Sequence, residues 1–149
     1  VTRKISDSVA KIKLGKIKQF SLGNLDAKRD WGFAKEFVSG MHKILNADEP
    51  DSYVLSTGKT TSVRDFLINS FNAVGIEIIF KGVGLELVAL DAQSNRTLVT
   101  IDEKFYRPTE VDLLIGDSSK AERNLGWKAK TNLEELARIM VEADMIRNK

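Results

Sequence analysis

The sequence contains no cysteine, a single histidine and only two prolines in 149 residues. Without cysteine there is no disulfide framework, thiol nucleophile or thiolate metal site. Such a composition is typical of a reducing compartment, so we expect a cytoplasmic protein. No apolar run approaches about 18 residues, so neither a membrane span nor a signal peptide is expected. His42 falls on the polar side of a predicted helix, which argues against a histidine metal centre or a Ser-His-Asp set.

A strong excess of charge of one sign is also lacking. Twenty-three Lys and Arg oppose 21 Asp and Glu, and the aromatic residues do not interleave with the basic ones, which disfavours a nucleic-acid module. Residues 1–18 are the exception, since they hold six Lys or Arg and one acid, Asp7. We interpret this run as the solvated face of a helix rather than an anion-binding surface. With 42% hydrophobic residues, the chain is predicted to form one domain over residues 1–149.

Apolar periodicity predicts five helices. The first carries Ile5, Val9 and Ile12 on one face and ends near Gly15. The second is expected to begin at Asp30 as N-cap, to use a face from Trp31 to Leu45, and to end near Ala47. The remaining three are expected from Ser62, with Asp65 completing a capping box, to Gly75; from Asp117 or Ser118 to Leu125; and after Thr131, with Glu134 in a second capping box.

Short β-type runs separate these helices. Strands are predicted at residues 17–22, 53–56, 76–80 and 98–101, and residues 81–96 indicate a loop or a hairpin. The sum predicts a small, helix-rich α/β domain with short strands.

Two motifs resemble phosphate-binding loops but lack a required glycine. Residues 58–60, Gly-Lys-Thr, match the end of a P-loop, yet Tyr53 stands where that loop needs its first glycine. Residues 82–84 match the start of a dinucleotide fingerprint, yet Leu87 replaces the glycine that permits close helix packing. We interpret both as ordinary turns and assign no cofactor-binding residue and no metal ligand.

Two arginines are candidates for anion binding. Arg29 lies between the strand-turn that ends at Asn24 and the second predicted helix, and Pro108 restricts Arg107 to extended backbone. Two guanidinium forks on one diphosphate would each contribute roughly 1.5–3 kcal/mol through charge-assisted hydrogen bonds. The alternative is that both cations only pair with neighbouring carboxylates, those of Asp26 or Asp30 and of Glu110 or Asp112.

The chain contains three motifs, Val1-Thr2-Arg3-Lys4-Ile5, residues 22–32 and residues 106–111. Two shorter stretches, Gly116-Asp117 and residues 125–128, follow them in the order found in one known family. Together they resemble the C-terminal, sugar-nucleotide-binding half of the GDP-mannose 4,6-dehydratases, which belong to the extended short-chain dehydrogenase/reductases. The resemblance covers nearly the whole chain. Because the chain begins with Val inside a predicted helix, we expect a piece of a longer protein whose N-terminal Rossmann half is missing here.

The resemblance implies roles for eight residues. The arginines of the Arg-Asp-Trp and Arg-Pro-x-Glu motifs are expected near the diphosphate, and the glutamate of the second on polar groups of the nucleotide. The Thr-Arg-Lys stretch is expected beside the base and sugar, and the Leu-Gly-Asn strand end beneath the nucleotide. In this sequence they are Arg29, Arg107 and Glu110, then Arg3 and Lys4, then Leu22, Gly23 and Asn24. Trp31 and Trp127 are interpreted as packing residues.

The resemblance also implies the reaction. Such an enzyme uses NADP to oxidise C4 of the mannosyl ring of GDP-mannose, eliminates water across C5 and C6, and returns the hydride to C6. It implies that the catalytic Thr, Glu, Tyr and Lys belong to the N-terminal half. Here Tyr53 is followed four residues later by Thr57, and Tyr106 by Glu110, so neither forms the Tyr-Lys pair. We expect the chain alone to bind sugar nucleotide at most and to turn nothing over.

Two residues depart from the family pattern, since Phe33 and Phe37 replace its usual His and Tyr. These losses bear on contacts with partners, and residues 84–97 match no familiar stretch. Two alternatives stay open: another nucleotide-sugar epimerase, dehydratase or reductase with a different base, or a non-catalytic binding or assembly domain. Without the N-terminal half we expect exposed apolar surface and self-association, which would form a homo-oligomer.

Overall fold

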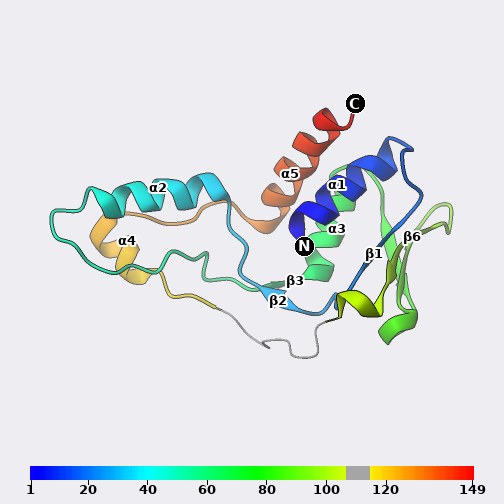
Figure 1. Cartoon of the computed structure of the whole chain (residues 1–149), viewed down its shortest axis with the longest axis horizontal. Coiled ribbons are helices and arrows are strands. Elements are labelled where there is room, and N and C mark those ends of the chain that lie inside the picture. The colour runs from blue at the N-terminus through cyan, green and yellow to red at the C-terminus, as the bar shows by residue number, and fades with distance from the viewer. Residues whose placement is uncertain (107–114) are drawn as a thin grey trace.

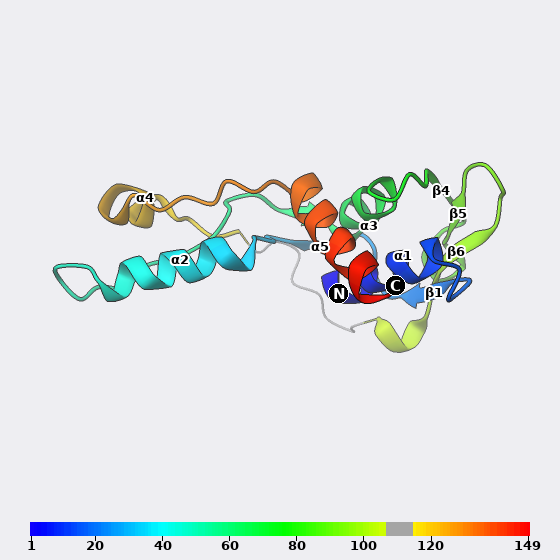
Figure 2. The ribbon, with the colours of Figure 1, turned by 90° about the horizontal axis from the view of Figure 1, so that it is seen from above.

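A computed structural model describes residues 1–106 and 115–149, and its elements form two regions at opposite ends of the long axis (Figures 1 and 2). The larger one, here the core region, contains three helices: α1 (Thr2–Lys13), α3 (Val63–Asn72) and α5 (Leu133–Arg147). Its sheet contains β1 (Phe20–Leu22), β4 (Ile78–Lys81), β5 (Val88–Asp91) and β6 (Thr97–Ile101). The predicted class, a helix-rich α/β domain with short strands, is confirmed.

The smaller region, here the arm (residues 34–55 and 115–128), contains α2 (Ala34–Leu45) and α4 (Ser119–Leu125). A ribbon of two short antiparallel strands lies between the two regions (Figure 1) and pairs β2 (Lys28–Arg29) with β3 (Thr61–Ser62). Two 3₁₀ turns flank the sheet, η1 (Gly84–Glu86) and η2 (Glu103–Phe105). In the described part of the chain, the helices are all too short or too polar to cross a membrane.

The sheet has the strand order β1-β6-β5-β4. β1 runs parallel to β6, with Leu22 opposite Ile101, and the other pairs are antiparallel. Residues 81–96, expected as a loop or a hairpin, contain the strand β5, which pairs antiparallel with β4 before it and with β6 after it. α1, α3 and α5 pack on one another beside the sheet (Figure 2), and one buried cluster joins them, with Ile5, Val9, Leu22, Phe66, Phe71, Leu98, Val99, Ala137 and Val141 at its centre.

Two helix termini match their sequence signals closely. Ser62 caps α3 and forms the predicted reciprocal capping box with Asp65. Gly15 follows α1 with a φ of 71°, a conformation that glycine adopts without the steric penalty of a Cβ. These signals are local, so neighbouring residues were sufficient to predict them.

The predicted start of the second helix is wrong. α2 begins at Ala34 with Phe33 in the N-cap position, and Asp30 lies before it in the chain leaving β2. The Asp30 carboxylate accepts hydrogen bonds from the backbone N–H groups of Thr57 and Gly58 and from the Thr57 hydroxyl. Several tertiary donors therefore replace the single local N–H that a cap would have used.

Two further predictions need correction. The last helix is capped by Asn132, whose side chain accepts from the backbone N–H of Glu135, and not by Thr131. Residues 53–56 form no ladder with other described residues, and Val54 is 54% exposed. A β-type run becomes a strand only where another strand offers it hydrogen bonds.

Candidate functional site

A cavity of about 460 Å³ opens where α1 begins, β1 ends and η2 folds back. Its described lining residues are Val1, Lys4, Leu22, Gly23, Asn24, Ala27, Arg29, Trp31, Val63 and Phe105. Five of the eight predicted nucleotide-binding residues are thus brought together on one cavity: Lys4, Leu22, Gly23, Asn24 and Arg29.

The end of β1 forms one wall of this cavity. Leu22 is buried, and its carbonyl accepts from the backbone N–H of Asp102, which anchors η2 beside the strand. Gly23 permits this approach, because a Cβ at that position would collide with the carbonyl group of Phe105. Asn24 then closes the turn by accepting from the backbone N–H of Asp26 at 2.9 Å. The glycine therefore serves the close packing of η2 against the end of β1.

Lys4 supplies positive charge from the first turn of α1. Its ammonium lies 3.5 Å from the centroid of the Phe105 ring, a cation–π contact. Partial burial and the nearby Lys104 ammonium lower the pKa of Lys4, while Asp102 opposes this shift. An anion bound in the cavity would stabilise the charged form that these surroundings disfavour.

Arg29 supplies the second cation from β2. Its Nη1 donates to the backbone carbonyl of Lys28 at 2.6 Å, and the strand pairing sets Arg29 opposite Thr61. Asp26 and Asp30 are the two acids expected to pair with Arg29 if that arginine binds no ligand. Asp26 accepts hydrogen bonds from the Nε and Nη2 atoms of Arg64. Asp30 accepts them from Thr57 and Gly58. Arg29 itself is one of the residues that line the cavity.

Two aromatic side chains complete the lining, and the sequence reasoning assigned neither of them to the site. Trp31 was predicted as a packing residue, and its ring does contact Phe66 edge-to-face at 5.4 Å between centroids. The same half-buried side chain also lines the cavity, as does Phe105, which is 41% exposed. The position of Phe105 directly before the Tyr-Arg-Pro motif is the one sequence signal that could have identified it.

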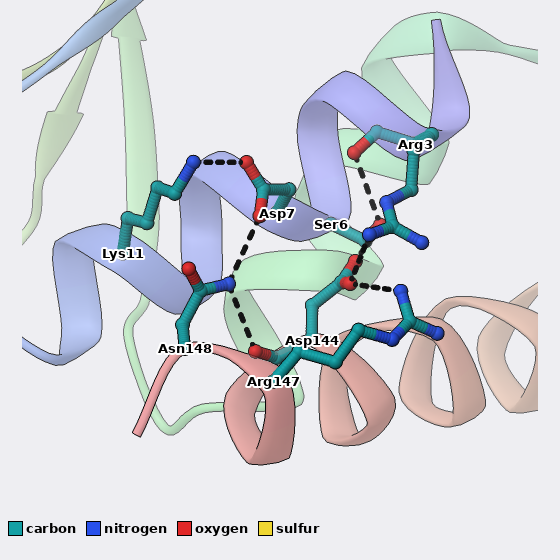
Figure 3. A network of polar contacts seen from close by, with 7 residues as sticks. All are labelled: Arg3, Ser6, Asp7, Lys11, Asp144, Arg147 and Asn148. Atoms are coloured by element: carbon teal, nitrogen blue, oxygen red, sulfur yellow. Dashed lines mark hydrogen bonds and ion pairs between the residues drawn. The ribbon is translucent and has the colours of Figure 1, made fainter.

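The other three residues predicted to bind the nucleotide divide into two groups. Arg107 and Glu110 lie outside the described residues, so their roles stay predictions. Arg3 is described, but it is not among the residues that line the cavity, and its guanidinium pairs with the buried carboxylate of Asp144 at 3.1 Å (Figure 3). Arg3 and Lys4 are therefore adjacent in the first turn of α1, but Arg3 contacts α5 while Lys4 lines the cavity.

A larger hollow of about 640 Å³ lies in the arm between the end of α2 and α4, where both signs of charge meet, and its described lining includes none of the predicted nucleotide-binding residues. Among the described residues, no cluster of three or more His, Asp or Glu is arranged to hold a metal ion.

The two glycine motifs do not form a dinucleotide site either. The Gly58 backbone N–H donates to the Asp30 carboxylate, and Gly82 and Gly84 form a turn into the three-residue η1. Neither motif joins a strand to the start of a long helix, as phosphate binding by a Rossmann fold requires. Neither glycine motif therefore has the setting of a Rossmann phosphate-binding turn.

Comparison with known proteins places the chain in a family. A sequence profile of the family described as GDP-mannose 4,6 dehydratase matches residues 1–140. The chain belongs to this family. GDP-mannose 4,6 dehydratase of Cricetulus griseus is 51% identical over 145 residues, and that of Homo sapiens is 50% identical. In each case the match covers 97% of this chain and 39% of the relative, so the chain spans about two fifths of the length of these relatives.

Solved structures show the same fold at low sequence identity. RMD from Pseudomonas aeruginosa complexed with NADPH superposes with a TM-score of 0.77 at 16% identity, covering 98% of this chain and 42% of that one. UDP-glucose 4-epimerase from Bifidobacterium longum, in complex with NAD+ and UDP, superposes with a TM-score of 0.66 at 19% identity, covering 97% and 39%. The fold is therefore that of the C-terminal part of extended short-chain dehydrogenase/reductases, as predicted.

Proposed function

We propose that the chain is the substrate-binding portion of a GDP-mannose 4,6-dehydratase and that its cavity holds the nucleotide of GDP-mannose. The observation that carries the proposal is the convergence of Lys4, Arg29 and the Leu22-Gly23-Asn24 strand end on one cavity. Lys4 lies 18 positions before Leu22, and the fold brings its helix beside the strand end and Arg29.

Each wall offers a group that suits one part of this ligand. Arg29 presents a planar fork of donors that matches the geometry of a diphosphate. Trp31 and Phe105 offer apolar ring surface to a base or ribose, and Lys4 adds a cation beside Phe105. Arg107 and Glu110 would complete the site from the Arg-Pro-x-Glu motif, as the resemblance implies.

The complete reaction belongs, in this proposal, to the longer enzyme. NADP would supply the hydride chemistry at C4 and C6 from the N-terminal part that the relatives have beyond this chain. The residues described here bind and orient the sugar nucleotide. Incubation of the chain with GDP-mannose and NADP is expected to give no keto product, and robust turnover would contradict this division of roles. A cytoplasmic location stays a prediction from composition.

We further propose that the arm contacts this N-terminal part. Val38 and Met41 on α2 are each more than half exposed, and so are Val54 and Ile115 on the neighbouring segments. Exposed apolar residues gathered in one region are typical of a surface that another part of the protein covers. Residues 53–56, which form no ladder with other described residues, could in addition join a sheet of that partner.

Isothermal titration with GDP-mannose and with UDP-glucose tests the proposed site. We expect selective binding of GDP-mannose, and we expect an Arg29→Ala, Arg107→Ala variant to lose it. Arg138→Ala is the matched control, because Arg138 lies on the exposed side of α5 and pairs only with its neighbour Glu142 among the described residues. Preference for UDP-glucose would favour a related nucleotide-sugar enzyme. No binding to folded protein would favour an assembly domain.

A further inference from the structure

The first turn of α1 borders the cavity, since Val1 and Lys4 line it. The same turn carries Arg3, which is not among the lining residues. The contacts that this turn makes with the rest of the protein therefore set where Lys4 lies.

Those contacts come from the last turn of α5. The carboxylate of Asp144 is 1% exposed and lies against α1 (Figure 3). It accepts a hydrogen bond from the Ser6 hydroxyl at 2.7 Å, pairs with the Arg3 guanidinium at 3.1 Å, and accepts from Arg147 Nη1 at 2.8 Å. A buried carboxylate requires donors of this kind, because burial without them is costly.

Asp144 is also placed against the preference of its own helix. An acidic side chain in the last turn of α5 (Leu133–Arg147) faces the negative end of that helix dipole. Asp144 thus carries a charge that the dipole of α5 opposes, and this charge pairs with Arg3 of α1. Residues that break a local rule in this way commonly serve a tertiary or functional role.

A second contact strengthens the same junction. The Asn148 amide, just after α5, donates to the Asp7 carboxylate and to the Asp144 backbone carbonyl, each at 2.9 Å (Figure 3). Asp7 also accepts from Lys11 within α1. The end of α5 therefore contacts two successive turns of α1, and the first of these turns carries Lys4 into the cavity.

We propose that Asp144 is a positioning residue of the nucleotide site. Through Arg3 and Ser6 it holds the first turn of α1, and it thereby sets the position of Lys4 in the cavity. The inference rests on the proposed function. In this inference Arg3 pairs with Asp144, whereas Lys4 contacts the ligand. Arg3 therefore affects nucleotide binding only indirectly, by positioning Lys4.

Titration of the full-length protein with GDP tests this inference. Asp144→Asn keeps the size of the side chain and one acceptor oxygen, so it removes mainly the charge. We expect GDP to bind about tenfold more weakly, the scale of effect that a slightly misplaced contact produces. Glu142→Gln is the matched control, since it removes a carboxylate of the same helix that pairs with Arg138 on the exposed side, and it should keep wild-type affinity.

A double variant tests whether Arg3 acts through Asp144. Arg3→Ala should weaken GDP binding by about the same factor as Asp144→Asn, and the two changes together should weaken it no further. Independent, additive losses would overturn the inference, because they would mean that Arg3 contacts the ligand by itself.

Phe71→Leu separates positioning from general destabilisation. Phe71 is fully buried in α3, eight residues beyond the cavity-lining Val63. We expect this variant to lower the melting temperature at least as much as Asp144→Asn while GDP affinity stays unchanged. Equal loss of affinity in both variants would overturn the positioning role, and so would unchanged GDP affinity in Asp144→Asn. A wild-type protein that binds no GDP would overturn the proposed function and this inference together.

Discussion

The core region and the arm each use a 12-residue amphipathic helix, but they bury these helices to different extents. On α1, Ile5 and Val9 are fully buried against α3 and α5. On α2, Val38 and Met41 are 61% and 55% exposed, although they belong to the apolar face that the sequence predicts. An apolar stripe therefore indicates that a helix has a surface to cover, but it does not reveal what covers it.

The arm has contacts of its own despite this exposure. Trp127 is 3% exposed, its Nε1 donates to the Glu36 carbonyl at 2.8 Å, and its ring meets Phe37 edge-to-face at 5.5 Å. Lys43 donates to the Leu125 carbonyl at the end of α4. A few such contacts hold α2 and α4 together, whereas one large cluster holds the core region. We therefore expect the two regions to differ in stability and to respond separately to mutation.

Removal of a core ring should have the largest effect. Phe66→Ala deletes a fully buried side chain that also supports Trp31 at the cavity, and it should lower the free energy of unfolding by about 3–5 kcal/mol. Leu45→Ala in the arm, where Leu45 is 84% exposed, should change it by less than about 0.5 kcal/mol. Urea titration followed by circular dichroism measures both. Similar losses in the two variants would contradict the contrast between the regions.

Trp127→Ala should loosen the arm and leave the core region intact. Because the Trp127 side chain contacts α2 through Glu36 and Phe37, its loss should speed amide hydrogen exchange in that helix about 100-fold. Exchange in α3 should stay at the wild-type rate, which serves as the internal control. Faster exchange in both regions would show that they unfold as a single unit.

Charges on the exposed face of α2 should reduce self-association. We expect the chain by itself to associate through this face. The double variant Val38→Glu, Met41→Glu should raise the dissociation constant of this self-association at least about tenfold, because it would bury charges in an apolar contact. Lys13→Glu, on the exposed side of α1, is the control and should leave association unchanged. Analytical ultracentrifugation over a concentration series measures both, and a wild-type monomer at every concentration would contradict the prediction.

Acid should weaken the α1–α5 junction by a small amount. Hydrogen bonds from Lys11 and Asn148 lower the pKa of Asp7 below its ordinary value of 3.8. The ionised carboxylate therefore stabilises the folded state above pH 3.8, and this contribution is lost as the pH falls through the lower, folded-state pKa. Melting temperatures of wild type and Asp7→Asn should differ at pH 6 and converge in stronger acid. A constant difference across the range would exclude this linkage.

Much of the fold and part of the site could be predicted from the sequence. Ser62 and Asp65 capped α3 as predicted, because a capping box involves residues three positions apart. Five predicted nucleotide-binding residues met on one cavity, and the family assignment from three motifs is confirmed. Asp30 was assigned wrongly, since the Thr57 and Gly58 donors that engage it lie 27 and 28 residues away.

By itself, the sequence determined the helices and strands whose signals are local, the family, and the residue types suited to a diphosphate. Only the tertiary structure decided that Lys4 faces the cavity while Arg3 faces Asp144, 141 positions further along the chain. It likewise decided that Trp31 and Phe105 share one cavity and that the apolar face of α2 stays exposed. The physical reason is that periodicity and caps act within a few residues, whereas the partner of a side chain depends on which distant segments the fold brings beside it.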